Sequence, residues 1–143
     1  MTVYLDINIV FDYLLGRQPF GNEVAQVITI LRGDHAELYV APNAIIMGYA
    51  FMRQQPDRKS PEQIKHSLAL FRKLANCVPI ENKDIDEALS KANPADLEDG
   101  FQIVLAVKCG ADIIITTDKK GVRNAPIKVM NTRDFLTDWE YSS

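Results

Sequence analysis

Acidic side chains follow two of the short apolar segments that predict β-strands. Asp6 comes directly after the segment 2–5, and Asp118 comes directly after the segment 113–117. A third acidic group, residues 96–99 (Asp-Leu-Glu-Asp), begins the helical segment that leads into 113–117. In an open parallel sheet, the residues just beyond the carboxyl ends of the strands line the crevice where ligands bind. If the two strands are neighbours, we expect all three acidic groups to meet at one edge of the sheet.

Such a cluster predicts a site for a divalent cation. Carboxylates that lie close together repel one another, so the cluster would destabilise the fold unless a cation offset its charge. Hard ions such as Mg²⁺ take oxygen ligands, often one or two carboxylates together with water and substrate phosphates. The chemistry that such a site supports is the activation of a water molecule by the metal.

Each acidic position also has a purely structural interpretation. Asp6 could be the N-cap of a helix that begins near Ile7. Asp96 and Asp99 resemble an acidic capping box, which the helix dipole favours. Asp118 precedes Lys-Lys-Gly and could be a turn residue. The placement of all three groups where one rim of a sheet is expected favours the shared site.

The hydrophobic pattern alternates between short β-type runs and longer helical stretches, the order expected for an α/β sandwich. The expected strands are 2–5, 37–40, 77–80, 113–117 and 127–130. The expected helices are 7–15, 22–32, 43–54, 61–75 (after Ser60 as N-cap), 84–91, 97–108 (after the interruption Asn93-Pro94-Ala95) and a short C-terminal helix capped by Thr132. The segment 113–117 is apolar and β-branched, which is typical of a parallel strand buried on both faces. We therefore expect residues 1–143 to form a single domain, a three-layer α/β/α sandwich with a central parallel sheet of four to five strands.

The composition fits one ordinary globular domain. The chain has 143 residues, 47% of them hydrophobic, and a chain of this length can fold without disulfides or a structural metal. Cys77 and Cys109 lack a partner at ligand spacing and are expected to be reduced, packed thiols. No apolar run approaches the roughly 20 residues that cross a bilayer, and no leader precedes the first strand, which indicates a cytoplasmic protein without a membrane partner. The net charge of −3 argues only against broad, nonspecific coating of nucleic acid.

The acidic segments and their neighbours resemble the motifs of the PIN domain family. The segment 4–12 (YLDINIVFD) is similar to the family's opening motif, an apolar strand that ends in Asp-x-Asn. The segment 96–102 (DLEDGFQ), followed by Ala106, resembles its third acidic motif, and 113–118 (IIITTD) resembles its fourth. The motifs occur in the family's order and span nearly the whole chain.

This resemblance implies a PIN-like fold and a metal-dependent endoribonuclease that hydrolyses RNA phosphodiester bonds, often the toxin of a VapC-type toxin–antitoxin pair. It implies that Asp6, Asp99 and Asp118 are the catalytic residues and bind Mg²⁺ or Mn²⁺. It gives supporting roles to Asp96, and to Asn8 and Thr116, which would orient the carboxylates.

One position departs from the family pattern. PIN nucleases usually carry a second acid, most often Glu, on the helix after the second strand, and Met47 stands at the matching position. A thioether is a poor ligand for a hard cation, and Asn43, one helical turn earlier, is a weak substitute. The alternative interpretation is a degenerate PIN domain that binds RNA or protein without catalysis.

Basic and apolar residues indicate where partners would bind. The candidate RNA-binding residues are Arg17, Arg53, Lys119 and Lys120, with Arg123 near the same rim. The helix 43–54 carries Tyr49, Phe51 and Met52, which fit a homodimer interface or a groove for an antitoxin segment, with core packing as the alternative.

Two other classes of protein fit the residues less well. A nuclease that cuts DNA uses similar carboxylates but usually carries insertions that grip DNA, and their absence here favours RNA. A receiver-like domain would be phosphorylated on Asp6, but it needs paired acids before that position and a Lys after a late strand. The Asp-x-Asn pattern and the acids at 96–99 match that arrangement poorly.

Overall fold

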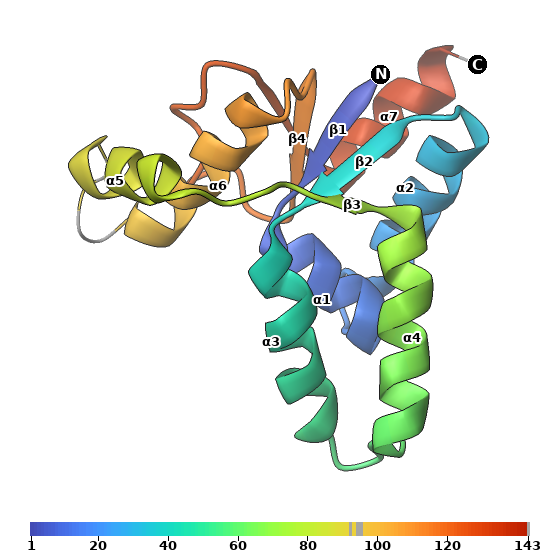
Figure 1. The fold of residues 1–143 in the computed structure, drawn as a ribbon. Coiled ribbons are helices and arrows are strands. Elements are labelled where there is room, and N and C mark those ends of the chain that lie inside the picture. Colours follow the sequence, from blue (N-terminus) through green and yellow to red (C-terminus); the bar gives the residue numbers. More distant parts are fainter. Residues whose placement is uncertain (92, 94–95, 143) are drawn as a thin grey trace.

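The computed structural model describes residues 1–91, 93 and 96–142, which form a parallel sheet covered by helices (Figure 1). The strands are β1 (Thr2–Leu5), β2 (Glu37–Val40), β3 (Asn76–Cys77), β4 (Ile113–Thr116) and β5 (Lys128–Asn131). The helices are α1 (Ile7–Leu15), α2 (Gly21–Gly33), α3 (Pro42–Arg53), α4 (Pro61–Leu74), α5 (Asn82–Lys91), α6 (Leu97–Lys108) and α7 (Thr132–Ser142).

The five strands lie in the order β3-β2-β1-β4-β5, and every neighbouring pair is parallel. β1 is therefore the middle strand, with β2 on one side and β4 on the other. The pairing sets Val3 opposite Ile113 and Leu5 opposite Ile115. The Asp6 amide continues this ladder by donating to Ile115 O at 3.0 Å. Because the two strands end together, the residues that follow them start from the same edge of the sheet.

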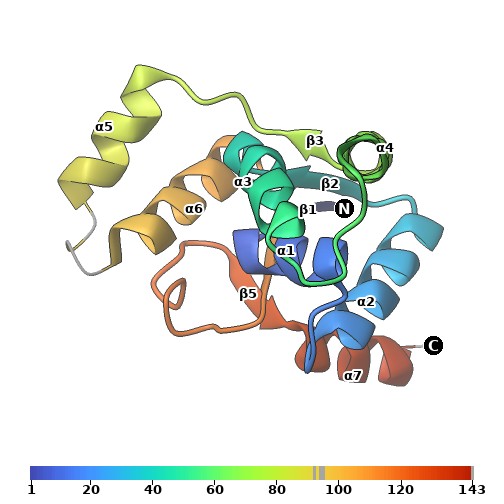
Figure 2. The same ribbon diagram turned by 90° about the horizontal axis from the view of Figure 1, so that it is seen from below.

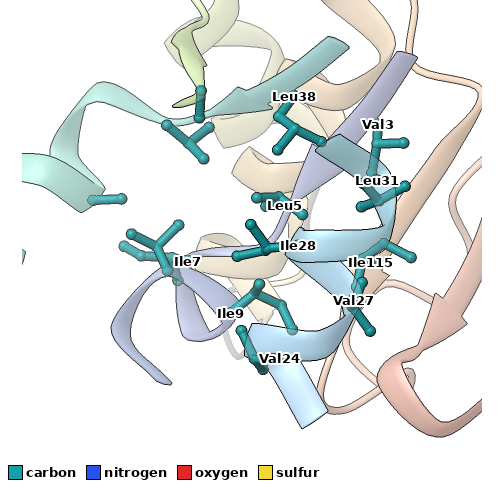
Figure 3. Close-up of a cluster of buried hydrophobic side chains, with 14 of the residues drawn as sticks. Val3, Leu5, Ile7, Ile9, Val24, Val27, Ile28, Leu31, Leu38 and Ile115 are labelled. Carbon is teal, nitrogen blue, oxygen red and sulfur yellow. The ribbon is translucent and has the colours of Figure 1, made fainter. Parts of the chain in front are cut away.

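Alternate side chains of the strands enter two separate cores. On one face, Leu5 and Ile115 pack with buried residues of α1 and α2 such as Ile9 and Ile28 (Figure 3). Buried residues of α3, α4 and α7 complete this core. On the other face, Tyr4 and Ile114 pack with Leu105 of α6 and with its neighbours. In Figure 1, α5 and α6 lie on the opposite side of the sheet from α2 and α7, and Figure 2 shows the same separation from below. This arrangement confirms the expected three-layer sandwich.

All four residues of β4 are buried, as the continuous apolar segment predicts. Each fully buried Ile side chain contributes about 1.5–3 kcal/mol relative to exposure. β4 therefore anchors the sheet from which Asp118 emerges.

The ends of several elements differ from the sequence-based expectation. β3 is only Asn76–Cys77, because Pro79 lacks the amide that a longer ladder would need. The expected strand 127–130 lies one residue later, as Lys128–Asn131. Ser60 is the N-cap of α4 and forms a full capping box with Gln63, as expected. The predicted interruption at 93–95 lies partly outside the described residues, because Pro94 and Ala95 are not among them.

The predicted cap of the C-terminal helix is wrong. Asn131 caps α7, since its Oδ1 accepts a hydrogen bond of 2.7 Å from the Asp134 amide. Thr132 is instead the first helical residue, and its hydroxyl donates to Glu23 Oε2 at 3.0 Å. The hydroxyl therefore connects α7 to α2.

Two further observations bear on expectations from the composition. Cys77 and Cys109 are half-buried free thiols, as expected. Among the residues described, none of the helices combines the length and the apolar content that a membrane span requires.

Buried Asp84 of α5 is held by a lysine of α6. Lys108 Nζ donates to Asp84 Oδ2 at 2.6 Å and to Pro79 O at 2.6 Å. The hydrogen bond from Lys108 lowers the pKa of Asp84, and Asp84 in turn raises the pKa of Lys108. This ion pair connects the beginning of α5 to the end of α6.

Candidate active site

Asp6 stands where β1 ends and α1 begins. Its side chain is 4% exposed, and its Oδ1 accepts a hydrogen bond of 2.8 Å from the Ile7 amide, so the expected N-cap role is confirmed. Oδ2 accepts a hydrogen bond of 2.8 Å from Thr116 Oγ1. Burial raises the pKa of Asp6, the two hydrogen bonds lower it, and the charges of Asp99 and Glu98 raise it. Asp6 is therefore a buried acid that faces other acids.

Thr116 connects the ends of the two central strands. Its side chain is fully buried at the end of β4, and its Oγ1 accepts a hydrogen bond of 3.2 Å from the Asp118 amide while donating to Asp6. Asp118 is exposed, and its Oδ1 accepts a hydrogen bond of 3.0 Å from the Lys120 amide. This bond matches the expected turn role of Asp118. Within the part of the chain that the structure describes, the other carboxylate oxygen of Asp118 accepts no hydrogen bond.

Asp99 lies in the first turn of α6 and packs against the loop that follows Asp118. A Cβ atom on Gly121 would overlap the Asp99 carboxylate, so a larger residue at this position would force the Asp99 side chain to move. Burial raises the pKa of Asp99 most strongly, followed by the charges of Glu98, Asp96 and Asp118. This contact could not be predicted from the sequence, because Gly121 resembles an ordinary turn glycine.

The three predicted acids therefore lie in one electrostatic neighbourhood. The charge of Asp99 raises the pKa of Asp6, and the charge of Asp118 raises the pKa of Asp99. Glu98, which the sequence analysis did not assign to the site, acts on both Asp6 and Asp99. Glu98 directly precedes Asp99 in the sequence, and this position is the feature from which its place in the site could have been predicted. We call Asp6, Glu98, Asp99 and Asp118 the acidic edge.

The acidic edge fits a hydrated hard cation better than a closed metal cage. Within the described part of the chain, no three His, Cys, Asp or Glu side chains converge closely enough to hold one ion together. Mg²⁺ commonly binds through one or two carboxylates and keeps several waters. The donors of the acidic edge are all carboxylate oxygens, which suit Mg²⁺ or Mn²⁺.

The two remaining supporting residues make no direct link to this edge. Asn8 is exposed in the first turn of α1, and among the residues described its side chain makes no hydrogen bond. Asp96 is exposed at the N-cap position of α6 but makes no capping hydrogen bond. The capping-box interpretation of Asp96 is therefore wrong, and its contribution to the edge is its charge on Asp99.

Met47 and Asn43 occupy the beginning of α3, which starts at the carboxyl end of β2. Met47 is 38% exposed, and Asn43 Nδ2 points at its sulfur over 3.9 Å. Asn43 Oδ1 is buried and has no hydrogen-bond partner in the described part of the protein. A buried unpaired oxygen is uncommon. The strand next to β1 thus brings a thioether and a free amide oxygen to its end, and no carboxylate.

Three of the four predicted RNA-binding residues are engaged within the protein. Arg17 pairs with buried Asp12 at 2.7 Å, and Lys119 pairs with Asp134 at 2.7 Å. Arg53 donates to Tyr49 Oη at 3.1 Å and lies over the ring of that residue. Arg17 follows α1 and Arg53 is the last residue of α3, so both lie roughly 13–18 Å along helices that begin near the sheet edge. Lys120, next to the acidic edge, has no side-chain ion pair among the described residues.

The apolar residues expected to face a partner lie mostly inside the protein. Met52 is buried, and Phe51 packs edge-on against Phe11 with ring centroids 4.8 Å apart. The exposed apolar residues of α3 are instead Ile46, at 74% exposure, and Met47. The other side of α3, with Ala44, Gly48 and Met52, is buried in the protein. The sequence pattern did not show which side of this helix is buried.

The protein is a parallel α/β sandwich in which acidic residues follow two adjacent central strands at the carboxyl edge of the sheet. The chain belongs to the PIN domain family, whose sequence model matches residues 2–120. It is 26% identical over 141 residues to Ribonuclease VapC1 of Aquifex aeolicus (strain VF5), covering 96% of this chain and 94% of that protein.

Solved structures share the fold at low sequence identity. VapBC-1 from nontypeable Haemophilus influenzae matches with a TM-score of 0.67 at 16% identity, covering 93% of this chain and 99% of that chain. VapBC2 from Rickettsia felis, solved bound to a DNA fragment from its promoter, matches with a TM-score of 0.64 at 12% identity, covering 92% and 98%. These two likenesses show that the fold described above is shared.

Proposed function

We propose that this protein is a metal-dependent endoribonuclease that hydrolyses RNA phosphodiester bonds at the acidic edge. The observation that carries the proposal is that Asp99, from a distant segment, lies near enough to Asp6 for its charge to raise the pKa of Asp6, while the charge of Asp118 raises the pKa of Asp99. The similarity to Ribonuclease VapC1 supports RNA as the substrate. The cytoplasm is the proposed compartment.

The residues at and beside the acidic edge have different proposed roles. Asp6, Asp99 and Asp118 would bind hydrated Mg²⁺ or Mn²⁺, one or two of them directly and the rest through metal-bound water, and Thr116 would keep the Asp6 carboxylate oriented through its 2.8 Å hydrogen bond. When bound there, the ion supplies a Lewis acid that lowers the pKa of water and offsets the charge of the phosphate. Lys120, exposed beside Asp118, would attract the phosphate backbone of the substrate.

We further propose that the protein is the toxin of a toxin–antitoxin pair. The fold is shared with VapBC complexes, which supports an antitoxin partner. Ile46 of α3 and Leu70 of α4 are exposed apolar residues on two helices that pack together. An antitoxin segment or a second copy of this chain would cover such exposed apolar side chains. A homodimer remains part of the proposal.

The test uses the purified protein, Mn²⁺ and single-stranded RNA. We expect one class of Mn²⁺ site and cleavage that stops when a chelator is added. Asp6→Asn and Asp118→Asn should each lower cleavage by at least about 100-fold, because the metal would lose a charged ligand. Circular dichroism checks that both variants stay folded. Full activity in both variants would remove the mechanism.

A second candidate function is a noncatalytic module that binds RNA or protein. The observation that favours it is Met47, which puts a thioether where related nucleases usually have an acid. The same titration separates the two functions. An RNA-binding module would retain RNA in a mobility-shift assay and leave it uncut at saturating Mn²⁺.

A further inference from the structure

One buried hydrogen bond connects the strand that precedes Asp6 to the helix that carries Asp99. Tyr4 Oη donates to Gln102 Oε1 at 2.5 Å. The two side chains are enclosed, with exposed fractions of 0% for Tyr4 and 1% for Gln102. No other hydrogen bond between side chains of β1 and α6 is seen among the residues described.

The Tyr4–Gln102 pair joins the same two segments of the chain that carry Asp6 and Asp99. Tyr4 precedes Asp6 by two residues at the end of a strand, and Gln102 follows Asp99 by three residues on a helix. Side chains at these spacings share a face of a strand or of a helix. The charge of Asp6 raises the pKa of Tyr4, as a smaller cause than burial. Tyr4 and Gln102 thus stand directly behind Asp6 and Asp99.

We propose that Tyr4 and Gln102 are positioning residues that fix the separation of Asp6 and Asp99 and thereby set the affinity of the acidic edge for Mn²⁺ or Mg²⁺. The inference rests on the proposed metal site. The remaining contacts of this interface come from apolar side chains such as Leu105 and Ile114. Apolar contacts have no preferred direction, whereas a hydrogen bond has a narrow range of length and angle. The Tyr4–Gln102 bond is therefore the contact that holds α6 at one position along β1.

A purely structural role predicts a different pattern from a positioning role. Tyr4→Phe or Gln102→Met alone leaves one buried polar group without a partner, which destabilises the fold. Tyr4→Phe combined with Gln102→Met leaves two apolar side chains of similar volume, so much of the stability returns. The directional contact does not return. A positioning role therefore predicts that metal affinity stays low in the double variant.

The experiment titrates Mn²⁺ into the full chain and into the three variants, below the unfolding temperature of each. A matched control is Tyr39→Phe on β2, because Tyr39 pairs with Tyr4 in the sheet and its hydroxyl makes no hydrogen bond among the described residues. We expect the double variant to bind Mn²⁺ roughly 10-fold more weakly than the wild type, the loss typical of residues behind metal ligands. Tyr39→Phe should bind as the wild type does. Cleavage assays should show a lower kcat with little change in KM for RNA.

The outcomes separate this inference from the proposed function. If the wild type binds Mn²⁺ and the double variant binds it equally well, the positioning role is overturned and the metal site stands. If Mn²⁺ affinity falls in the single variants and recovers with stability in the double variant, the pair acts only through folding and the inference is again overturned. If the wild type itself does not bind Mn²⁺, the proposed function and the inference both fall.

Discussion

Thr116 Oγ1 donates a hydrogen bond of 2.8 Å to Asp6 Oδ2 across 110 positions of sequence. The other oxygen of Asp6 accepts the Ile7 amide, so the carboxylate both caps α1 and faces the end of β4. Each carboxylate oxygen has more than one lone-pair site. The hydrogen bonds therefore orient Asp6 and still leave acceptor capacity for a cation, and capping and metal binding are compatible roles.

Thr116→Val should remove this hydrogen bond at nearly constant volume. We expect a loss of about 1–3 kcal/mol in the free energy of unfolding, because the bond is made to a charged group. Mn²⁺ binding should weaken as well, since Asp6 loses its orientation. Urea denaturation and metal titration measure the two effects. Thr117→Val, at the half-buried neighbouring position, is the control, and equal behaviour of the two variants would contradict the role given to Thr116.

Asp6→Asn should become more stabilising as the pH rises. Burial raises the pKa of Asp6, so the native protein keeps this proton to a higher pH than the unfolded chain does. The stability linked to that proton is fully present below the unfolded pKa, about 3.9, and is lost as the pH rises through the folded pKa. Asn carries no such charge. Urea denaturation of both proteins near pH 4 and pH 7, in the presence of a chelator, measures the difference.

In the same pH range, Asp84 behaves in the opposite way to Asp6. The pKa of Asp84 is lowered, so its contribution is present above its unfolded pKa and is lost as the pH falls. This contribution is the same in both proteins and cancels in the difference. Saturating Mn²⁺ should favour the wild type over Asp6→Asn, because a ligand stabilises the state that binds it. A stability difference that is independent of pH would count against a raised pKa at Asp6.

Gly121→Ala should disturb the acidic edge with little cost to the fold. The added methyl group would overlap the Asp99 carboxylate, which can rotate away because it is the end of a side chain. We therefore expect a change in unfolding free energy within about 1 kcal/mol and a clear loss of Mn²⁺ affinity. Gly33→Ala, where a Cβ has open space, is the control. Unchanged metal binding in Gly121→Ala would show that Asp99 is not a ligand.

Met47→Glu should tighten metal binding. Met47 is partly exposed on α3, so the fold tolerates a polar side chain there. A carboxylate a few ångström from a divalent ion contributes on the order of 2 kcal/mol even in bulk water, or roughly 10-fold or more in affinity. Ile46→Glu places the same charge one position earlier, on the exposed part of the helix. Equal Mn²⁺ affinity in the two variants would place residue 47 outside the metal site.

The order and type of the elements followed from sequence because the local signals were strong. The segment 113–117 is continuously apolar, and Ser60-Pro61 is a clear helix start; both were confirmed. The adjacency of β1 and β4, which the site requires, was a hypothesis that strand pairing confirmed. Errors fell at element ends, as at Asn131, where two neighbouring residues can both cap a helix.

The contacts within the site were harder to predict because they depend on tertiary structure. Gly121 matters only because a loop folds back onto Asp99, and Gln102 matters only because it meets Tyr4 across two elements. Arg17 was predicted to bind RNA, but in the structure it forms an ion pair with Asp12. Charge patterns along a sequence show which groups exist, and packing decides which of them already have partners.

The site is assembled from the two ends of the fold, and this has a consequence during synthesis. β1 is translated well before its partner β4, which ends at Thr116. A nascent chain that has not yet released this strand from the ribosome lacks both the Thr116 hydroxyl and Asp118. With the proposed activity, the protein would become able to cut RNA only after its chain had been synthesised beyond Asp118.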